Sequence, residues 1–273
     1  MSWTTVRVRP ATRRDDVLAA LFAAGVGGVQ EDGDAYVTQI DEHFDIDALR
    51  RAVAEADPGA EIGTAPLPDV DWAEAWKRGV TAHAVGGLVV TPPWLAAGTD
   101  PARTIVIEPE MAFGTSEHAT TRGVLALLQS VLRPGDRVAD LGAGSAVLSI
   151  AAAKLGARRA AAIELDPDAI GNAEANVAAN GVSDCVTVVL GDAATLLPLV
   201  APVDLVLANI LSGVIRGLLP SIGAALAPGG RAIFSGIMES ERSEMLDALR
   251  AAGWRVTEER TEEAWWTVAV VRA

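Results

Sequence analysis

Residues 137–146 read RVADLGAGSA, and this stretch decides the fold class. Its first five residues are mostly apolar, as in a strand that is buried on both faces of a parallel sheet. Gly142 and Gly144 follow directly, and glycines let a ligand approach the backbone closely. A helix expected at 146–155 would offer free N–H groups at its start. The stretch therefore predicts a strand, a glycine-rich turn and a helix that together face a ligand.

The chain on both sides of this turn alternates between strands and helices. We expect strands at 137–141, 160–165, 186–190, 205–209 and 231–235, and helices at 146–155, 167–180, 212–226 and 239–252. This order is typical of an α/β protein with a doubly wound parallel sheet. Residues 255–271 contain two strand patterns with an acidic connection and no helix, which predicts a terminal hairpin.

The first sixty residues have a different pattern. Strands are expected at 4–9, 26–30 and 35–40, and helices at 14–24 and 46–56, an order similar to a small ferredoxin-like α+β unit. Residues 63–70 are rich in Pro and Gly without periodicity, which indicates a linker. We therefore expect a small N-terminal domain over 1–62, a linker over 63–70 and a larger domain over 71–273.

Composition restricts the function classes. The chain has 273 residues, 22 Lys+Arg and 36 Asp+Glu, and its net charge of −14 argues against binding to nucleic acid or anionic membranes. Cys185 is the one cysteine, so a disulfide framework and a multi-cysteine metal site are excluded, and we expect no metal. The N-terminus lacks a signal-peptide pattern, and no run of about 18 apolar residues exists. We expect a monomeric cytoplasmic protein without direct nucleic-acid or membrane contacts.

The acidic residue after the glycine turn indicates the kind of ligand. Glu164 stands at the end of the next expected strand, where a carboxylate accepts ribose hydroxyls. The dinucleotide fingerprint requires a third glycine where Val147 stands, which counts against a pyrophosphate cofactor. Asp140, two residues before Gly142, suits a cationic ligand. S-adenosylmethionine has a sulfonium, an ammonium and no phosphate, so we interpret the turn as its site, with Gly142, Gly144, Asp140 and Glu164 as contacts.

Two further strand ends carry polar side chains. Asp192 follows the third strand, where it would accept from an adenine amino group or cap the next helix. Asn209 ends the fourth strand, at the edge where open α/β sheets bind ligands. Its carbonyl would orient an incoming neutral amine, and the alternative is that it fixes its own turn. Asn209 is thus a candidate for both catalysis and cofactor binding.

Residues 108–121 (EPEMAFGTSEHATT) precede a helix expected at 122–132, and we interpret them as a loop that closes over the cofactor. Thr115 and His118 are candidate catalytic residues, and Phe113 and Thr121 are candidate cofactor contacts. Other roles stay open, because Phe113 would also serve as a core anchor, Thr121 as a helix cap and His118 as a structural residue.

Seven stretches together resemble the PrmA family, bacterial methyltransferases that modify a ribosomal protein with S-adenosylmethionine. They are DWAEAW (71–76), PPW (92–94), IEPEMAFGTSEHATT (107–121), DLGAGSAVLSIAAAKLGA (140–157), IELDPDAI (163–170), LANIL (207–211) and PGGRAIFSGI (228–237). The resemblance implies a Rossmann-like seven-strand methyltransferase sheet and an N-terminal substrate-recognition domain. It implies cofactor contacts at Thr121, Gly142, Glu164 and Asn209. The family usually has Gly where Glu110, Ser116 and Ala146 stand, and we expect the methyl group of Ala146 to be tolerated.

The resemblance also implies N-methylation of lysine side chains and of the N-terminal amine of a large-subunit ribosomal protein. Such a basic partner suits the acidic chain. Asn209 would position the neutral amine, and His118 is a weaker hypothesis for the proton acceptor. Three alternatives stay open: a methyltransferase for another protein or a small molecule, a nicotinamide oxidoreductase, and a cofactor-binding protein without turnover.

Overall fold

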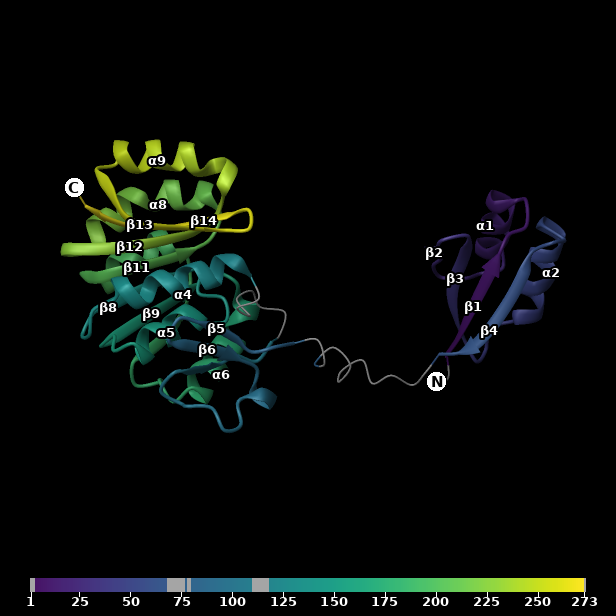
Figure 1. The fold of residues 1–273 in the computed structure, drawn as a ribbon, viewed down its shortest axis with the longest axis horizontal. Helices are drawn as coiled ribbons and strands as arrows, with labels where there is room; N and C mark the ends of the chain where they lie inside the picture. Colours follow the sequence, from purple (N-terminus) through teal and green to yellow (C-terminus); the bar gives the residue numbers. More distant parts are fainter. Residues whose placement is uncertain (1–2, 68–76, 78–79, 110–117, 273) are drawn as a thin grey trace. The chain divides into compact units, whose positions relative to one another are not determined.

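A computed structural model describes residues 3–67, 77, 80–109 and 118–272. The chain divides into two compact units, Met1–Gly79 and Val80–Ala273, which are labelled by element in Figure 1. Within the described part of the chain, the helices are too short or too polar to cross a bilayer.

The first unit is a four-stranded antiparallel sheet with two helices. Its sheet order is β2-β3-β1-β4. The β-α-β-β-α-β element order is that of the ferredoxin-like motif. Alternate residues of β1 and the inner faces of both helices form one small core, to which Val6, Val8, Leu21 and Leu49 contribute. The elements are β1 (Trp3–Arg9), α1 (Arg14–Ala23), β2 (Gln30–Asp32), β3 (Ala35–Asp41), α2 (Ile46–Ala56) and β4 (Glu61–Pro66).

The last strand of this unit corrects the expected linker. Residues 63–66 belong to β4, which pairs antiparallel with β1 and is followed by a hydrogen bond from Leu67 N to Trp3 O of 2.8 Å. Almost all of β4 is exposed, so its sequence has no alternation of apolar and polar residues to reveal a strand. The remainder of the expected linker, 68–70, lies outside the described residues.

The second unit is built on a seven-stranded sheet of order β10-β9-β8-β11-β12-β14-β13. Five strands are parallel, and β14 pairs antiparallel with both β12 and β13, which confirms the doubly wound sheet and the terminal hairpin. The strands are β8 (Arg137–Leu141), β9 (Arg159–Glu164), β10 (Val186–Leu190), β11 (Val203–Asn209), β12 (Leu226–Met238), β13 (Trp254–Glu262) and β14 (Trp265–Arg272).

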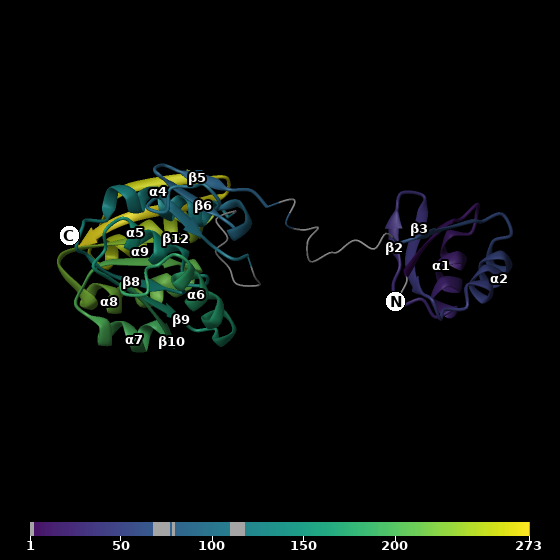
Figure 2. The same cartoon turned by 90° about the horizontal axis from the view of Figure 1, so that it is seen from below.

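Helices cover both faces of this sheet. One core cluster joins α4, α5 and α6 to the sheet and to a small three-stranded sheet, and the other joins α7, α8 and α9 (Figure 2). These helices are α4 (Ala119–Val131), α5 (Val147–Lys154), α6 (Pro167–Ala179), α7 (Ala193–Val200), α8 (Ser212–Ala225) and α9 (Arg242–Ala251). The small sheet contains β5 (His83–Val85), β6 (Leu88–Thr91) and β7 (Thr104–Val106).

Two helix predictions need correction. The helix α7 was considered only through the alternative role of Asp192 as a cap and was missing from the expected helices, because Pro198 stands inside it and its sequence has few polar residues to mark one face. The helix α4 begins at Ala119 rather than at 122, with His118 at its N-cap position. Thr120 and Thr121 therefore lie buried within its first turn and are not helix caps.

Candidate functional site

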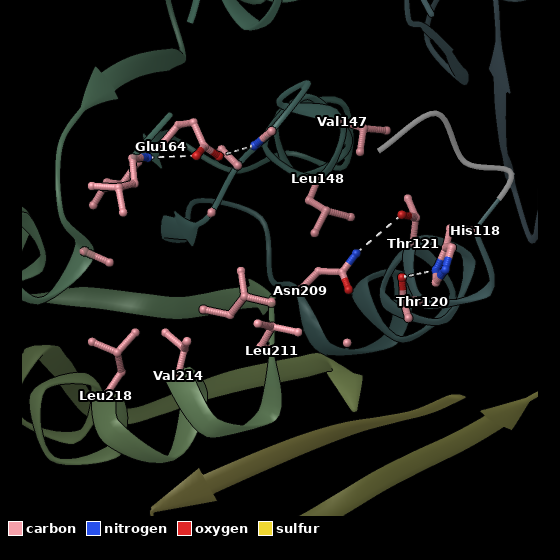
Figure 3. A pocket seen from close by; sticks show the side chains of 18 of the residues that line it. His118, Thr120, Thr121, Val147, Leu148, Glu164, Asn209, Leu211, Val214 and Leu218 are labelled. Atoms are coloured by element: carbon pink, nitrogen blue, oxygen red, sulfur yellow. Dashed lines mark hydrogen bonds between the residues drawn. The ribbon is translucent and has the colours of Figure 1, made fainter. Parts of the chain in front are cut away.

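A cavity of about 740 Å³ opens at the carboxyl edge of the parallel strands, where open α/β sheets bind ligands (Figure 3). The first turn of α4 and the start of β14 complete its wall. The residues that line it are His118, Thr120, Thr121, Gly142, Ala143, Gly144, Val147, Leu148, Ile163, Glu164, Leu165, Gly191, Asp192, Ala193, Asn209, Ile210, Leu211, Val214, Leu218, Gly236 and Trp265.

The glycine turn after β8 is fixed by close packing. Gly142 has a φ of +71°, and a Cβ atom there would lie 2.4 Å from Ile210 Cγ2. The backbone N–H groups of Gly142 and Ala143 both donate to Ile163 O, at 2.9 and 3.1 Å. A side chain at Gly142 would therefore collide with the neighbouring strand end and require a left-handed conformation that L residues avoid.

Ala146 is strained, contrary to the expectation that its methyl group is tolerated at the start of a helix. Its φ of 63° and ψ of 16° lie in the left-handed region, and its side chain is fully buried. This conformation costs an L residue with a Cβ atom about 1–2 kcal/mol. The glycine that the family usually has at this position is the one indication of this backbone conformation, and the expectation did not use it.

Asp140 lies beneath the turn and does not line the cavity. Its Oδ2 accepts hydrogen bonds from Ser149 N at 3.1 Å and from Ser149 Oγ at 2.8 Å, which anchors the start of α5. Its Oδ1 is buried and accepts no hydrogen bond from the described residues. Burial raises the pKa of Asp140 to about 7. The geometry thus gives Asp140 a role in building the turn rather than the predicted contact with a cationic ligand.

Glu164 lines the cavity and joins two turns. Its Oε2 accepts from Gly144 N at 2.7 Å, and its Oε1 accepts from Leu165 N and Asp166 N at 2.8 and 2.9 Å. A carboxylate has about four lone-pair positions, so these three N–H groups leave one free. In this arrangement Glu164 has room for one further donor, and a second ribose hydroxyl would have to displace a backbone N–H group.

Asp192 also lines the cavity, and it caps α7. It accepts from Thr195 N at 3.0 Å and from Thr195 Oγ1 at 2.9 Å. The hydroxyl of Thr195 is the main cause that lowers the pKa of Asp192. The helix-cap interpretation therefore describes the observed contacts, and the adenine contact stays a prediction for a residue that is exposed at the cavity wall.

Asn209 and Thr121 meet across the cavity. Asn209 Nδ2 donates to Thr121 Oγ1 at 3.4 Å, and Figure 3 shows the carbonyl oxygen of Asn209 pointing away from this contact. Within the part of the chain that the structure describes, Oδ1 has no hydrogen-bond donor. Two predicted site residues from distant segments are thus brought together, and an amide oxygen in the cavity wall is left as an acceptor.

His118 stands beside this pair. Its Nδ1 is 2.8 Å from Thr120 Oγ1, and its ring makes an edge contact with Trp265 at 5.0 Å between ring centroids. Both contacts fix the orientation of an otherwise exposed imidazole. The other two predicted loop residues, Phe113 and Thr115, lie outside the described residues.

Several residues of the cavity wall were missed by the sequence predictions. Trp265 is at the start of β14, and this strand runs antiparallel to β12. The start of an antiparallel strand lies at the edge where its parallel neighbours end, so the expected hairpin would have placed Trp265 there only once its pairing with β12 was known. Gly236, Leu211 and Val214 also line the cavity: Gly236 lies near the end of β12, Leu211 follows β11, and Val214 is in the first turn of α8.

The lining has a charge pattern that discriminates between ligands. Among the described residues of the wall, Glu164 and Asp192 are acidic and none is Lys or Arg. Such a wall suits a nucleoside that carries positive charge and disfavours a pyrophosphate. The cradle at Gly142 and the carboxylate of Glu164 therefore fit S-adenosylmethionine. In the described ranges, no group of three or more His, Cys, Asp or Glu side chains could hold a metal ion.

The sheet order, the antiparallel terminal hairpin and this cavity define the class of α/β methyltransferases. In a comparison with the sequence models of known families, residues 22–273 match the family described as "Ribosomal protein L11 methyltransferase (PrmA)". The chain belongs to this family.

Individual relatives agree. A protein from Pelotomaculum thermopropionicum named ribosomal protein L11 methyltransferase is 41% identical over 217 residues, which cover 79% of this chain and 70% of the relative. One of the same name from Thermus thermophilus is 42% identical over 205 residues, 75% of this chain and 78% of the relative. The crystal structure of a ribosomal protein L11 methylase from Lactobacillus delbrueckii subsp. bulgaricus matches with a TM-score of 0.62 and 29% identity, over 71% of this chain and 99% of that structure.

Proposed function

We propose that this protein transfers methyl groups from S-adenosylmethionine to amines of a large-subunit ribosomal protein, namely lysine side chains and the N-terminal amine. The observation that carries the proposal is the position of Asn209. Its unpaired amide oxygen stands in the same cavity wall as the glycine turn and Glu164. An acceptor for an amine therefore lies beside a binding site for a nucleoside.

The turn side of the cavity would hold the cofactor. Glu164 would accept a ribose hydroxyl, Asp192 the adenine amino group, and Gly142 and Gly144 allow close approach of the backbone. When bound, S-adenosylmethionine supplies an electrophilic methyl group and a thioether leaving group. The protein aligns the amine with that methyl group and keeps water out.

Asn209 would position the attacking amine. A free lysine amine has a pKa near 10.4, and only its neutral form attacks. An apolar wall and a neighbouring positive charge both lower that pKa. The Asn209 oxygen would accept one N–H of the neutral amine, which directs the nitrogen lone pair toward the methyl group. This transfer requires no strong protein base. A weaker proposal is that His118 takes up the released proton through Nε2, since its Nδ1 contacts Thr120 Oγ1 and no described residue hydrogen-bonds to Nε2.

Charge supports a basic protein as the partner. Residues 1–65 contain 6 Arg and 12 Asp+Glu, which gives −6 of the total of −14. We propose that the N-terminal unit recognises the substrate and steers its approach electrostatically. The relatives are named for methylation of ribosomal protein L11, and we extend that substrate to this chain. We place the reaction in the cytoplasm and the active form as a monomer.

The test is methyl transfer from radiolabelled S-adenosylmethionine to purified ribosomal proteins, with mass spectrometry of the labelled product. We expect label on one large-subunit protein, at lysine and the N-terminal amine, at a rate that falls as salt increases. Label on a small molecule or on an unrelated protein would replace the substrate assignment. Cofactor binding by calorimetry without any transfer would identify a non-catalytic binder.

A further inference from the structure

Four apolar side chains form a rim on one side of the cavity mouth. Leu211, Val214 and Met238 are 74%, 49% and 46% exposed, and Trp265 lines the cavity. A group of exposed apolar side chains at a cavity is informative, whereas a single one is not. Figure 3 shows Leu211 and Val214 on the α8 side of the cavity, close to Asn209. Met238 is the partner of Trp265 across the β12–β14 pair. We call Leu211, Val214, Met238 and Trp265 the apolar rim.

The rim is held together by one carboxylate. Glu241 accepts from Ser212 Oγ at 2.5 Å and from Met238 N at 2.9 Å. It therefore ties the start of α8, which follows Leu211, to the end of β12, which carries Met238. The backbone segments that carry Leu211 and Met238 are thus tied to each other through Glu241.

Acidic residues border the rim. Glu239 donates its backbone N–H to Ala264 O at 2.8 Å, and its carboxylate accepts from Thr261 Oγ1, which places it next to the terminal hairpin. Neither Glu239 nor Glu241 has an ion-pair partner within 4 Å among the described residues. The hydrogen bond from Ser212 is the main cause that lowers the pKa of Glu241, so this carboxylate is ionised. The charge of Arg216 also lowers the pKa of Glu241, but this guanidinium is paired with Glu244, so the border still attracts positive charge.

We infer that the apolar rim binds the segment of the substrate protein that carries the reacting amine. An apolar side chain next to that amine would pack on Leu211, Val214 and Met238, and basic residues beyond it would lie against Glu239 and Glu241. The inference rests on the proposed function, because it assigns this segment to the mouth of the methyl-transfer cavity. A neutral polar segment would leave the rim exposed and would not match the acidic border.

The test separates binding from transfer. Fluorescein-labelled 12-residue peptides of Gly, Arg and a single Lys, with either Leu or Ser beside the Lys, are titrated by anisotropy up to millimolar protein. Methyl transfer to the same peptides is measured separately. We expect the Leu peptide to bind about tenfold more tightly than the Ser peptide to the unaltered protein.

The rim variants are Met238→Ser and the pair Leu211→Ser with Met238→Ser. Both variants should lose the preference for the Leu peptide, because they remove the side chains on which the Leu beside the Lys would pack. Loss of the preference in the variants would show that the rim and this Leu are energetically coupled. Met238 does not line the cavity, so Met238→Ser should keep its cofactor Kd within about twofold by calorimetry. Leu199→Ser is the matched control, because Leu199 is 76% exposed on α7 and outside the cavity wall.

Each outcome decides one proposal. Equal affinity for the two peptides, no binding of either, or an unchanged preference in the Met238 variants overturns the rim. Binding of the Leu peptide with the expected preference, but no methyl transfer to any peptide or ribosomal protein, overturns the proposed function and leaves the rim standing.

Discussion

The two sides of the cavity are held in place by different kinds of hydrogen bond. On the turn side, Glu164 bonds to three backbone N–H groups, and Asp192 bonds to the first turn of its own helix. On the amine side, the contacts join side chains, Asn209 to Thr121 and His118 to Thr120. The backbone fixes the groups that would hold a cofactor, whereas adjustable side chains surround the place where an amine would react.

This difference gives a physical rule for substitutions. Groups that bind cofactor equally in the ground state and the transition state change its Kd, and groups that align the amine change kcat. Changes on the turn side should therefore appear in cofactor affinity or stability, and changes on the amine side in turnover.

Asn209→Ala should have the largest effect. It removes the acceptor that we propose to align the amine, and loss of one such positioning group lowers kcat by about 100-fold or more. Turnover under saturating cofactor and calorimetric Kd are measured on the same preparation. A variant with near-normal kcat, or one whose loss lies entirely in Kd, would put Asn209 on the binding side.

Glu164→Gln should weaken cofactor binding by about 10–100-fold, because a hydrogen bond to a charged group is worth about 1.5–3 kcal/mol. The kcat under saturation should stay within about threefold. Asp166→Asn is the matched control, since Asp166 is exposed, caps α6 through Asp168 N and does not line the cavity. If both variants bound cofactor equally well, the assignment of Glu164 would be wrong.

Asp140→Asn tests the buried side of the turn through pH. The pKa of Asp140 is raised from its ordinary value of 3.8 to about 7, so the neutral form is favoured in the folded protein. Its contribution to stability is fully present below about 3.8 and is lost as the pH rises through about 7. Asn keeps an acceptor for Ser149 without the charge. Between pH 5 and 8 the free energy of unfolding of the unaltered protein should fall by an amount on the order of 2 kcal/mol, and the variant should lack this fall. The measurement is Tm against pH without cofactor, and the profile of the variant should be flatter. Parallel profiles for the two proteins would contradict the assignment.

Thr121→Val sharpens the amine side. It keeps the size of the side chain and removes the acceptor for Asn209 Nδ2, so kcat should fall about 3–10-fold, as for a hydrogen bond of about 0.5–1.5 kcal/mol. Thr121→Ser should restore most of the activity. A merely structural role would lower Tm and leave kcat unchanged, and that result would remove Thr121 from the positioning of Asn209.

The amino-acid sequence predicted best what depends on continuous apolar runs and on strand ends. The bounds of β8 and β10 were predicted correctly, and Gly142, Glu164, Asp192 and Asn209 all line the cavity because each lies at or beyond the carboxyl end of a parallel strand. The edge strand β4 was missed because an exposed strand has no hydrophobic alternation.

Side-chain direction and backbone conformation were beyond the reach of such patterns. Asp140 stands only two residues before Gly142, yet its carboxylate turns toward Ser149 on α5 and away from the cavity. Trp265 comes from the opposite end of the domain, through a strand pairing that the order of residues does not specify. The left-handed conformation of Ala146 leaves no trace in the hydrophobic pattern, and its one signal is the glycine that the family usually has at this position.

Ala146→Gly should have the smallest effect, and it tests whether the turn side stores strain. Glycine adopts φ near 63° without the cost of a Cβ atom, about 1–2 kcal/mol, and this gain is partly offset by about 0.5–1 kcal/mol of backbone entropy. We expect Tm to rise by about 1–3 °C. Ala153→Gly, in the last turn of α5, is the control and should lower Tm, since glycine costs up to about 1 kcal/mol in place of alanine in a helix. If Ala146→Gly lowered Tm as much as the control, the backbone at Ala146 would be unstrained. Favourable contacts alone would then hold the turn side of the cavity in place.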